Sequence, residues 1–501
     1  MKKNKIYIGG GFSEDQLLWI IPIISNYFNN SKQNIIYIEN KLSKTFLESS
    51  IFKKYLKNFK MLDQNNLHFF KSKFVRYLFV IFKNFLKIFF FIFFVNRNSI
   101  LKKKNKWFSF QFYHSFWDTS LNYCKDGQLE PSFLNKFIAI SRCCMALDMA
   151  KKIHKAGVKF VFLGHTVYVN RALFAYLRSK KIKIFTQAAF NLHSQSKLKD
   201  NSWLYISKGK LSLVKKKVNI NQINQYFIKR NKGKGNYYDS ENALKGIKKN
   251  TNLKDFNTLF LHVFRDSPYN FIDKNRIFVD YFDWIIKTLK ILKDSKEKWI
   301  IRYHPSHKRW GEDQSITLKK IINIAFNNST LPSNIFIDEG IYSNLYLIKN
   351  SKKIVTFNGS VQLEAACFGK KVITIVSNFK NLNLEIDICP KNLSEYKKFL
   401  LIGSQQYSAF SKLNVNQILN SRYLLYIIEN IHYLKKDLNA SEIYRGDGEK
   451  LRKVNFKKIM LNIEANKGFF LKNSIYLKEG GTHTISKRFI NYFIDHQKSN
   501  I

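Results

Sequence analysis

Short apolar runs alternate along this chain with longer segments in which apolar residues recur every three or four positions. In the second half the runs are rich in β-branched and aromatic residues, which is typical of strands buried on both faces of a parallel sheet. The predicted strands are 258–264, 299–303, 334–338, 354–357 and 372–376. The predicted helices between them are 274–293, 315–327, 343–350 and 360–368. This alternation predicts a doubly wound α/β domain.

The first half shows the same alternation with longer interruptions. "KIYIGGGFSEDQLLWIIPIISNYF" predicts a strand, a glycine-rich turn and a helix capped by Ser13, and "QNIIYIEN" predicts the next strand. A second unit has a strand at 158–163, a helix at 170–179 and a strand at 182–186. Between these units, "FSFQFYHSFWDTSLNYC" predicts a strand and a loop ahead of a long helix.

Length and linker composition set the expected domains. At 501 residues the chain exceeds one ordinary core, so two domains are expected. Residues 205–250 lose apolar periodicity and gain Lys, Asn and Gly, as linkers do. We expect a Rossmann-like domain over 1–215, a linker over 216–250, a second Rossmann-like domain over 251–404 and a helical extension over 405–501. The extension is expected to pack across the first domain and to end in a tail.

Residues 74–95, "FVRYLFVIFKNFLKIFFFIFFV", are the most apolar part of the chain. Arg76, Lys83 and Lys87 interrupt this segment at spacings that share one helical face, which favours a basic amphipathic helix over a membrane span. Two interpretations remain open. An aromatic face beside lysines is typical of a helix on an anionic membrane, and a core helix whose lysines reach solvent has the same pattern.

The net charge of +50 would ordinarily indicate nucleic acid or an anionic membrane as a partner. No zinc-finger spacing, RNA-binding aromatic motif or helix-turn-helix accompanies it, and the Lys-, Asn-, Ile- and Phe-rich composition is typical of an AT-rich genome. We therefore expect no nucleic-acid partner, and instead anionic substrates or a membrane leaflet.

The cysteines and the start of the chain predict a cellular compartment. Five cysteines without metal-ligand spacing are expected to be buried, reduced thiols: Cys124, Cys143, Cys144, Cys367 and Cys389. The sequence enters a strand-like segment directly, without the apolar region of a signal peptide, which predicts a cytoplasmic protein.

Polar residues follow three predicted strands of the second half. His304-Pro305 follows "KWIIRY", Asp338-Glu339-Gly340 follows "NIFI", and Asn358-Gly359-Ser360 follows "KIVTF". In a doubly wound sheet these strand ends share the edge at which ligands bind. A capped helix and a His-Pro turn would explain each motif separately, but their combination favours a binding site.

These residue types suit a phosphorylated ligand. Gly359 would let the backbone approach the ligand, and Ser360 at the helix start would meet a phosphate. His304, held by Pro305, would donate to a phosphate oxygen, and Arg302 would add positive charge. Glu364, one turn into the helix, would accept hydrogen bonds from sugar hydroxyls such as those of a ribose.

"IIRYHPSHKRW", followed by "KNSKKIVTFNGSVQLEAACFGKKVITI", resembles the bacterial capsule polysaccharide biosynthesis family, which includes the Kdo transferases. The resemblance covers residues 258–376 and implies a GT-B-like architecture, with two Rossmann-like domains facing a cleft. It implies transfer of a sugar from a CMP- or UDP-sugar to a growing glycan or lipid-linked acceptor, with inversion, no metal and no cofactor beyond the nucleotide-sugar co-substrate. The residues that it implies at the nucleotide are His304, Pro305, Gly359, Ser360, Glu364, Gly369 and Lys370.

An inverting transfer requires a general base for the acceptor hydroxyl. Residues that could line the opposite wall are Asp118 and His114 in "HSFWDTS", His165 in "LGHTVYVNR" and Asp266 in "LHVFRDSP". Asp118, His165 and Asp266 are the predicted catalytic set. Asp338-Glu339-Gly340 is expected to form a strand-end turn, because sialyltransferases of this architecture carry their acidic motif before the His-Pro pair.

Other functions share this second-domain pattern. One is a UDP-GlcNAc 2-epimerase-like enzyme that acts on the donor alone, another is a glycerophosphotransferase-like enzyme, and a third is a non-catalytic polysaccharide-assembly protein. The glycosyltransferase interpretation predicts a nucleotide-sugar donor and a glycan or glycolipid acceptor as partners. It also predicts a peripheral position on the inner face of the cell membrane.

Overall fold

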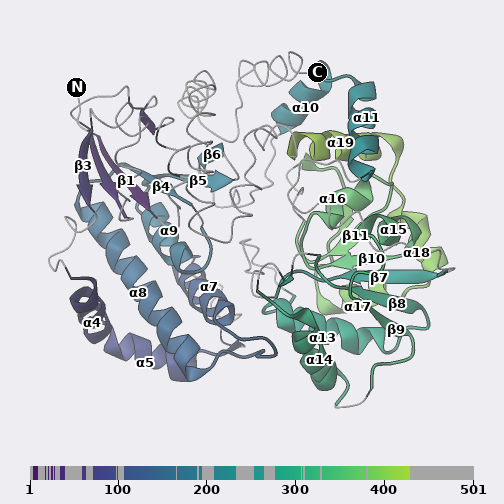
Figure 1. The fold of residues 1–501 in the computed structure, drawn as a ribbon, viewed down its shortest axis with the longest axis horizontal. Helices are drawn as coiled ribbons and strands as arrows, with labels where there is room; N and C mark the ends of the chain where they lie inside the picture. Colours follow the sequence, from purple (N-terminus) through teal and green to yellow (C-terminus); the bar gives the residue numbers. More distant parts are fainter. Residues whose placement is uncertain are drawn as a thin grey trace, which may run out of the picture.

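The computed structural model describes residues 4–9, 34–39, 59–63, 72–97, 107–164, 166–188, 191–194, 208–232, 253–264, 277–305, 311–327, 330–377 and 382–428, with a few single positions besides. Two α/β bodies lie side by side, the first coloured purple to blue and the second teal to green (Figure 1). Each body is built on one six-stranded sheet.

The first sheet has the strand order β3-β2-β1-β4-β5-β6, and all of its pairs are parallel except β5 with β6. Its strands are β1 (Lys5–Gly9), β2 (Ile35–Ile38), β3 (Lys60–Asp63), β4 (Phe160–Leu163), β5 (Lys183–Ala188) and β6 (Asn191–Ser194). The helices described in this body are α4 (Lys73–Lys83), α5 (Phe85–Phe94), α7 (Trp107–Asn122), α8 (Phe133–Lys155) and α9 (Val169–Ser179). The long helix α8 packs against the other four.

The second sheet has the order β12-β11-β10-β7-β8-β9 and is parallel throughout. Its strands are β7 (Phe256–Phe260), β8 (Lys298–Arg302), β9 (Ile335–Asp338), β10 (Ile354–Thr356), β11 (Val372–Thr374) and β12 (Asp387–Ile388). Its helices are α10 (Lys208–Lys217), α11 (Ile220–Asn231), α13 (Tyr281–Leu292), α14 (Gln314–Ala325), α15 (Asn344–Asn350), α16 (Val361–Ala366), α17 (Leu393–Leu401), α18 (Ser404–Ser411) and α19 (Val415–Tyr426).

Both sheets follow one winding rule. Numbered from its own first strand, each runs 3-2-1-4-5-6, which is the order of a Rossmann fold. The direction of winding reverses between β1 and β4 in the first sheet and between β7 and β10 in the second. The expected fold class, two Rossmann-like domains of GT-B-like type with further helices at the carboxyl-terminal side, is confirmed by these strand orders.

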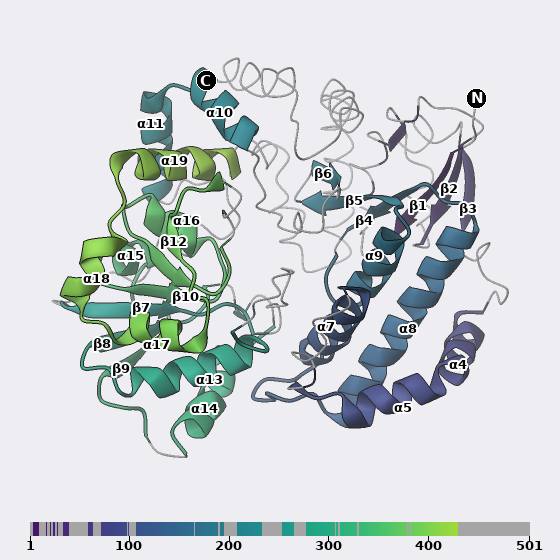
Figure 2. The ribbon, with the colours of Figure 1, turned by 180° about the vertical axis from the view of Figure 1, so that it is seen from behind.

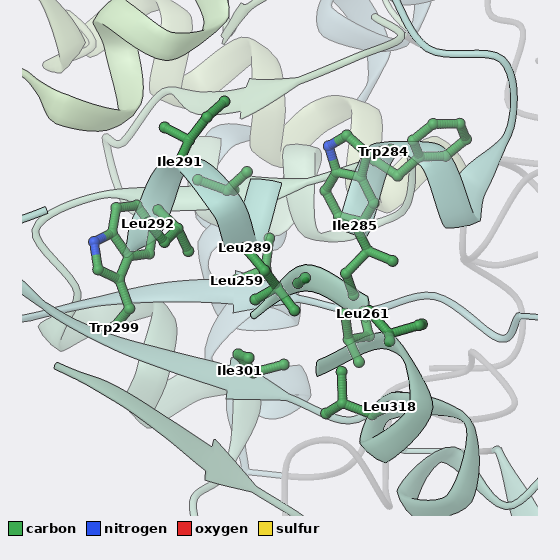
Figure 3. Close-up of a cluster of buried hydrophobic side chains, with 14 of the residues drawn as sticks. Leu259, Leu261, Trp284, Ile285, Leu289, Ile291, Leu292, Trp299, Ile301 and Leu318 are labelled. Carbon is green, nitrogen blue, oxygen red and sulfur yellow. The ribbon is translucent and has the colours of Figure 1, made fainter. Parts of the chain in front are cut away.

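The second sheet is buried on both faces, as its continuous apolar strands predict. Neighbouring residues of β8 point to opposite sides: Ile301 belongs to the cluster under α13 and α14, and Ile300 to the cluster under α15 and α16. Figure 3 shows Trp284 and Leu289 of α13 among the labelled residues of the first cluster. Helix α13 begins at Asp280, whose carboxylate accepts a hydrogen bond from the Asp283 amide at 2.9 Å.

Helix α7 corrects one expectation, because its sequence predicts a strand and a loop. Its central residues, from Phe110 to Ser120, are almost all buried, so it is a core helix between α8 and α9. Phenylalanine, serine and threonine favour strands or turns locally. A helix buried on nearly every side has no amphipathic period to reveal it.

The predicted linker and extension also differ from the structure. Helix α11 falls within 216–250, and together with α10 it packs against α19 of the second body. Helices α18 and α19 likewise pack on the second domain, so the described part of the extension does not lie across the first domain. Residues 233–250 and 429–501 lie outside the described residues.

The segment 74–95 forms two helices rather than one. Helix α4 ends at Asn84, whose side-chain amide donates to the Val80 carbonyl at 2.8 Å, and α5 continues at an angle of 71°. The bend separates the three cations that one straight helix would have aligned. Arg76 is buried, the Lys87 ammonium lies 3.8 Å from the centre of the Phe112 ring, and Lys83 is exposed.

Many apolar residues of these helices face outward, whereas Val80, Ile88, Phe91 and Ile92 are buried against the first domain. We call the exposed apolar side chains of α4, α5 and the start of α8 the α4–α5 surface. It consists of Phe74, Val75, Leu78, Phe79, Phe82, Phe85, Leu86, Phe89, Phe90, Phe93, Phe94, Phe133 and Leu134. Within the described residues no single helix has the length and hydropathy to cross a membrane, and α4 with α5 meets that requirement only as a bent pair.

Four of the five cysteines are buried free thiols, as expected. Cys389 is exposed, which corrects that expectation. It lies directly after the short edge strand β12, where little of the second domain covers it.

Candidate functional site

The carboxyl ends of β7, β8 and β10 lie beside the reversal point of the second sheet, where ligands collect in folds of this kind. His262 follows β7, His304 follows β8, and Asn358-Gly359-Ser360 follows β10. The rings of His262 and His304 lie 5.4 Å apart between centres. Two of the predicted strand-end motifs are thus placed on one edge, together with His262.

Gln314 holds the two histidine segments together. Its buried side-chain oxygen accepts a hydrogen bond from the His304 amide at 2.8 Å, and its amide group donates to the His262 carbonyl at 2.8 Å. The His262 amide in turn donates to the Tyr281 hydroxyl at 2.6 Å. These bonds fix the backbone at both strand ends, so the imidazoles start from rigid positions.

His304 is a neutral imidazole at physiological pH. Burial, together with the nearby His262, His307 and Arg302, lowers its pKa from the usual value to about 3. A neutral imidazole has one N–H donor and one acceptor nitrogen. His304 can therefore donate to an anionic oxygen or accept a proton, but it does not contribute a full positive charge.

Glu364 is held by two partners that the sequence pattern did not predict. Its Oε1 accepts a hydrogen bond from the Ser360 hydroxyl at 2.9 Å and lies 3.3 Å from Nη2 of Arg230. Arg230 belongs to α11, where a lysine- and asparagine-rich context hid it. The Ser360 hydroxyl is thus bonded to Glu364 and does not cap α16, although the sequence is compatible with a capped helix at this position.

Gly359 leaves open space at this edge. A Cβ built on it would meet no atom within 4 Å, so the backbone there is accessible. Asn358 and Pro305 are partly buried and flank the same edge. Their contact with a ligand stays a prediction.

Arg302 is placed differently from the expectation. Its side chain is buried, with Nη1 3.1 Å from Asp338 Oδ2 and Nε donating to Asn344 Oδ1 at 3.1 Å. Asp338 Oδ1 also accepts a hydrogen bond from the Ile341 amide at 2.8 Å. This pair closes the turn after β9, so the acidic motif is a strand-end turn as predicted, and the Arg302 charge is compensated within it.

Gly369 and Lys370 have local structural contacts. The Lys370 ammonium donates to the carbonyls of Lys349 and Ser351 at 2.5 and 2.7 Å, which ties β11 to the end of α15. Burial lowers its pKa to about 8. Gly369 has a φ of 83°, a conformation that favours glycine. These contacts explain the Gly-Lys pair without a ligand.

The predicted general bases are placed only in part. Asp118 is buried in α7 and its carboxylate lies 2.9 Å from Nη1 of Arg171 on α9, so the pair joins two core helices. His114, one turn earlier, is also buried, with its ring 4.4 Å from that of Phe110. His165 and Asp266 lie outside the described residues.

Hydrogen bonds show that this edge of the second sheet faces the first domain. Asp280, which begins α13 after β7, accepts from Nε of Arg97 at 2.7 Å and from the Trp117 indole at 3.1 Å. Thr317 of α14, which follows β8, accepts from the Gly127 amide at 3.0 Å. The elements that follow β7 and β8 thus form the interdomain contacts.

A cavity of about 510 Å³ lies at the opposite edge, beside the amino ends of β7 and β8. Lysines and acids line it together, and Lys352 is paired with Asp255 at 2.7 Å. None of the predicted site residues lines this cavity.

No family model and no curated protein matches the chain. Among solved structures, a UDP-GlcNAc 2-epimerase from Methanocaldococcus jannaschii, in complex with UDP-GlcNAc and UDP, is 14% identical over 85% of this chain and 98% of its own, with a TM-score of 0.30. A UDP-GlcNAc 2-epimerase from Neisseria meningitidis, bound to UDP-GlcNAc, is 11% identical over 86% of this chain and 100% of its own, with a TM-score of 0.25. An α,α-trehalose 6-phosphate synthase from Burkholderia multivorans is 8% identical over 93% and 99%, with a TM-score of 0.30. At these TM-scores the likeness carries no inference about activity.

Proposed function

We propose that this protein is a nucleotide-sugar-dependent glycosyltransferase of capsule or other surface polysaccharide biosynthesis. The observation that supports the proposal is that His262, His304 and the Asn358–Ser360 turn follow three neighbouring strands at the reversal point of a Rossmann-like sheet, with the two imidazoles 5.4 Å apart. This edge carries donors and acceptors of the kinds that a phosphate and a ribose require.

In the proposed complex the nucleotide lies across the ends of β7, β8 and β10. The neutral His304 donates its N–H to a phosphate oxygen. The Ser360 hydroxyl, which donates to Glu364 in the free protein, turns to the phosphate beside Gly359. Glu364, oriented by Arg230, accepts hydrogen bonds from the ribose hydroxyls. Stabilising the leaving diphosphate or monophosphate in this way lowers the barrier to transfer.

The acceptor is proposed to be a growing glycan or glycolipid at the inner face of the cell membrane, approaching from the first domain. His165 and Asp266 remain the proposed bases for the acceptor hydroxyl. Asp118 is the weaker candidate, since its carboxylate is occupied by Arg171 in the core.

The test combines donor binding with transfer. A panel of CMP- and UDP-sugars is screened by calorimetry, and transfer is then assayed with the bound donor and extracted glycolipid acceptors. His304→Asn and Glu364→Gln are expected to lose at least about tenfold in donor affinity or transfer rate while remaining folded. The exposed His154→Asn and Glu385→Gln should behave as wild type, since they change the same residue types away from the site. Wild-type affinity and transfer in both site variants would contradict the proposal.

The bases are tested separately by His165→Asn and Asp266→Asn, with donor affinity as the companion measurement. A true base loses rate by about a hundredfold or more with unchanged donor affinity. Asp118→Asn is expected to lower stability first, because it removes the carboxylate that lies 2.9 Å from the buried Arg171 guanidinium.

The adjacent imidazoles of His262 and His304 favour a second candidate, an enzyme of the UDP-GlcNAc 2-epimerase type. Two titratable groups at the donor could move protons on the sugar without any acceptor. Incubation with the bound donor alone, followed by product analysis, distinguishes the two. Conversion or hydrolysis of the donor without acceptor would favour the epimerase type.

A further inference from the structure

The α4–α5 surface is apolar although it is exposed. Its most exposed members, Phe82 and Leu86, are 84% and 81% exposed, and they lie on either side of the bend at Asn84. Monomeric soluble proteins rarely expose contiguous apolar patches that extend over two helices. A surface of this kind indicates a partner.

The opposite faces of both helices are occupied by the first domain. Val80, Ile88, Phe91 and Ile92 are buried in a cluster with α7 and α8, and the Phe91 ring lies 5.1 Å from that of Phe116. Helices anchored on one side cannot be surrounded by lipid or cross a bilayer. The geometry allows a half-embedded position, parallel to a membrane surface.

Charge identifies the partner. From residue 64 to 117 the chain contains no aspartate or glutamate, whereas lysines and arginines occur throughout. In the structure Lys73 and Lys83 are exposed at the two ends of α4, beside the aromatic side chains. An apolar face flanked by these lysines is complementary to an anionic leaflet, where headgroups meet the lysines and acyl chains meet the rings. Glu130, near the start of α8, is paired with Arg97 at 2.9 Å.

A second copy of the chain fits this surface less well. A two-fold contact would bring the same lysines together without any acidic partner from this segment, in a protein of net charge +50. In both ribbon views α4 and α5 lie along the outer edge of the first domain, with the second domain on its other side (Figures 1 and 2). The surface is thus also not the contact between the two domains.

We propose that the α4–α5 surface docks the protein on an anionic membrane leaflet, with both helices lying in the membrane plane and Phe82, Leu86 and their neighbours inserted at the level of the acyl chains. This docking does not depend on the proposed activity, because it involves no residue of the strand-end site.

The test is sedimentation of the full chain with vesicles of phosphatidylglycerol and phosphatidylethanolamine, against vesicles of phosphatidylcholine, without nucleotide. Wild type is expected to bind the anionic vesicles and to be released by salt. The double variant Phe82→Ser/Leu86→Ser is expected to bind these vesicles at least about tenfold more weakly than wild type. Val415→Ser/Phe336→Ser, which removes exposed apolar side chains from the second domain, should bind as wild type.

The charge contribution is tested by Lys73→Gln/Lys83→Gln, expected to weaken binding about fivefold per lysine. Lys320→Gln/Lys397→Gln is the matched control, since both lysines are exposed on the second domain. Equal loss in both pairs would show non-specific attraction by net charge and would overturn the assignment of the surface.

Stability and oligomeric state complete the test. Phe82→Ser/Leu86→Ser should keep the wild-type melting temperature, because both side chains are exposed. A marked fall in melting temperature would mean that another part of the chain covers this face. A wild-type oligomer that this variant dissociates, without vesicle binding, would mean that a second copy covers it. Either result, or wild-type binding by this variant, would overturn the proposal.

Discussion

At the scale of single residues, His304 combines a partly buried position at a strand end with a strongly shifted protonation equilibrium. Its imidazole is only partly buried, yet its pKa falls to about 3 because burial and neighbouring positive groups disfavour the imidazolium. The negative charge of a ligand phosphate would instead favour the imidazolium form of His304. Binding of an anion at this edge should therefore raise the pKa of His304 and couple ligand affinity to pH.

His304 is expected to make the protein less stable in mild acid. In the unfolded chain a histidine takes up a proton near pH 6.5, whereas in the folded state His304 remains neutral until about pH 3, so stability is lost as pH falls through this window. Between pH 7 and 5 the wild type should lose about 2 kcal/mol more than His304→Asn, as an upper figure. Urea unfolding at several pH values measures the difference. Parallel profiles for the two proteins would contradict the shifted pKa.

At the scale of elements, α11 brings a residue of the interdomain connection to the candidate site. Helix α11 packs beside α16 and α19, and the side chain of its Arg230 contacts Glu364 of α16. The Arg422 side chain links the same elements by donating to Asn224 Oδ1 at 2.9 Å. The first turn of α16 is therefore supported by a segment that lies far away in sequence.

The pair Arg230 and Glu364 is expected to act as one unit. Arg230→Met and Glu364→Gln each remove one charge of a largely buried ion pair, so each should cost about 3 kcal/mol of stability. The double variant should cost about 1–3 kcal/mol less than the sum of the two single losses, which is the coupling energy in a double-mutant cycle measured by urea unfolding. Additive losses would show that the two side chains do not interact.

The sequence predicted those elements whose pattern of apolar residues reflects which of their faces are buried. Strands such as β8 and β10 were visible because continuous apolar runs are required when helices cover both faces. The strand-end histidine and glycine turns were visible for the same reason, since a polar motif stands out after such a run. Helix α7 was missed because it is buried on nearly every side, and Arg230 was missed because a helix rich in Lys and Asn has the composition of a linker.

The buried contacts in the structure show what Arg302 and Asp118 do, which the sequence pattern alone could not show. Arg302 and Asp118 have the residue types of site groups and stand near strand ends or a conspicuous motif. Their partners, Asp338 and Arg171, lie on elements distant in sequence, and only the fold brings them within 3.1 and 2.9 Å. No local pattern distinguishes a compensated charge from an available one.

At the scale of the whole molecule, Asp280 joins the two domains. Its Oδ2 receives Arg97 and Trp117 from the first domain, while its Oδ1 caps α13. Arg97 also donates to the Leu129 carbonyl at 2.9 Å, so its position is fixed from both sides.

Asp280→Asn is expected to loosen the domains without unwinding α13. Asparagine is as good a cap as aspartate, but Arg97, largely buried, would lose the carboxylate of the second domain and keep Glu130 of its own domain as an acidic partner. Hydrogen exchange around Trp117 and Leu129 should become faster, with little change in the core of α13. Asp283→Asn serves as the control, because Asp283 pairs with the half-exposed Lys287 of its own helix. Unchanged exchange at Trp117 would contradict the role of Asp280.

The elements that follow β7 and β8 have two tasks, since they support the candidate site and also hold the first domain. Gln314 begins α14 and fixes both histidine segments, and Thr317, one turn later, receives the Gly127 amide across the domain boundary. We therefore expect occupancy of the proposed site and the angle between the domains to be thermodynamically linked. If a change in the domain angle alters the affinity for the ligand by a certain factor, ligand binding must shift the equilibrium between the two domain arrangements by the same factor.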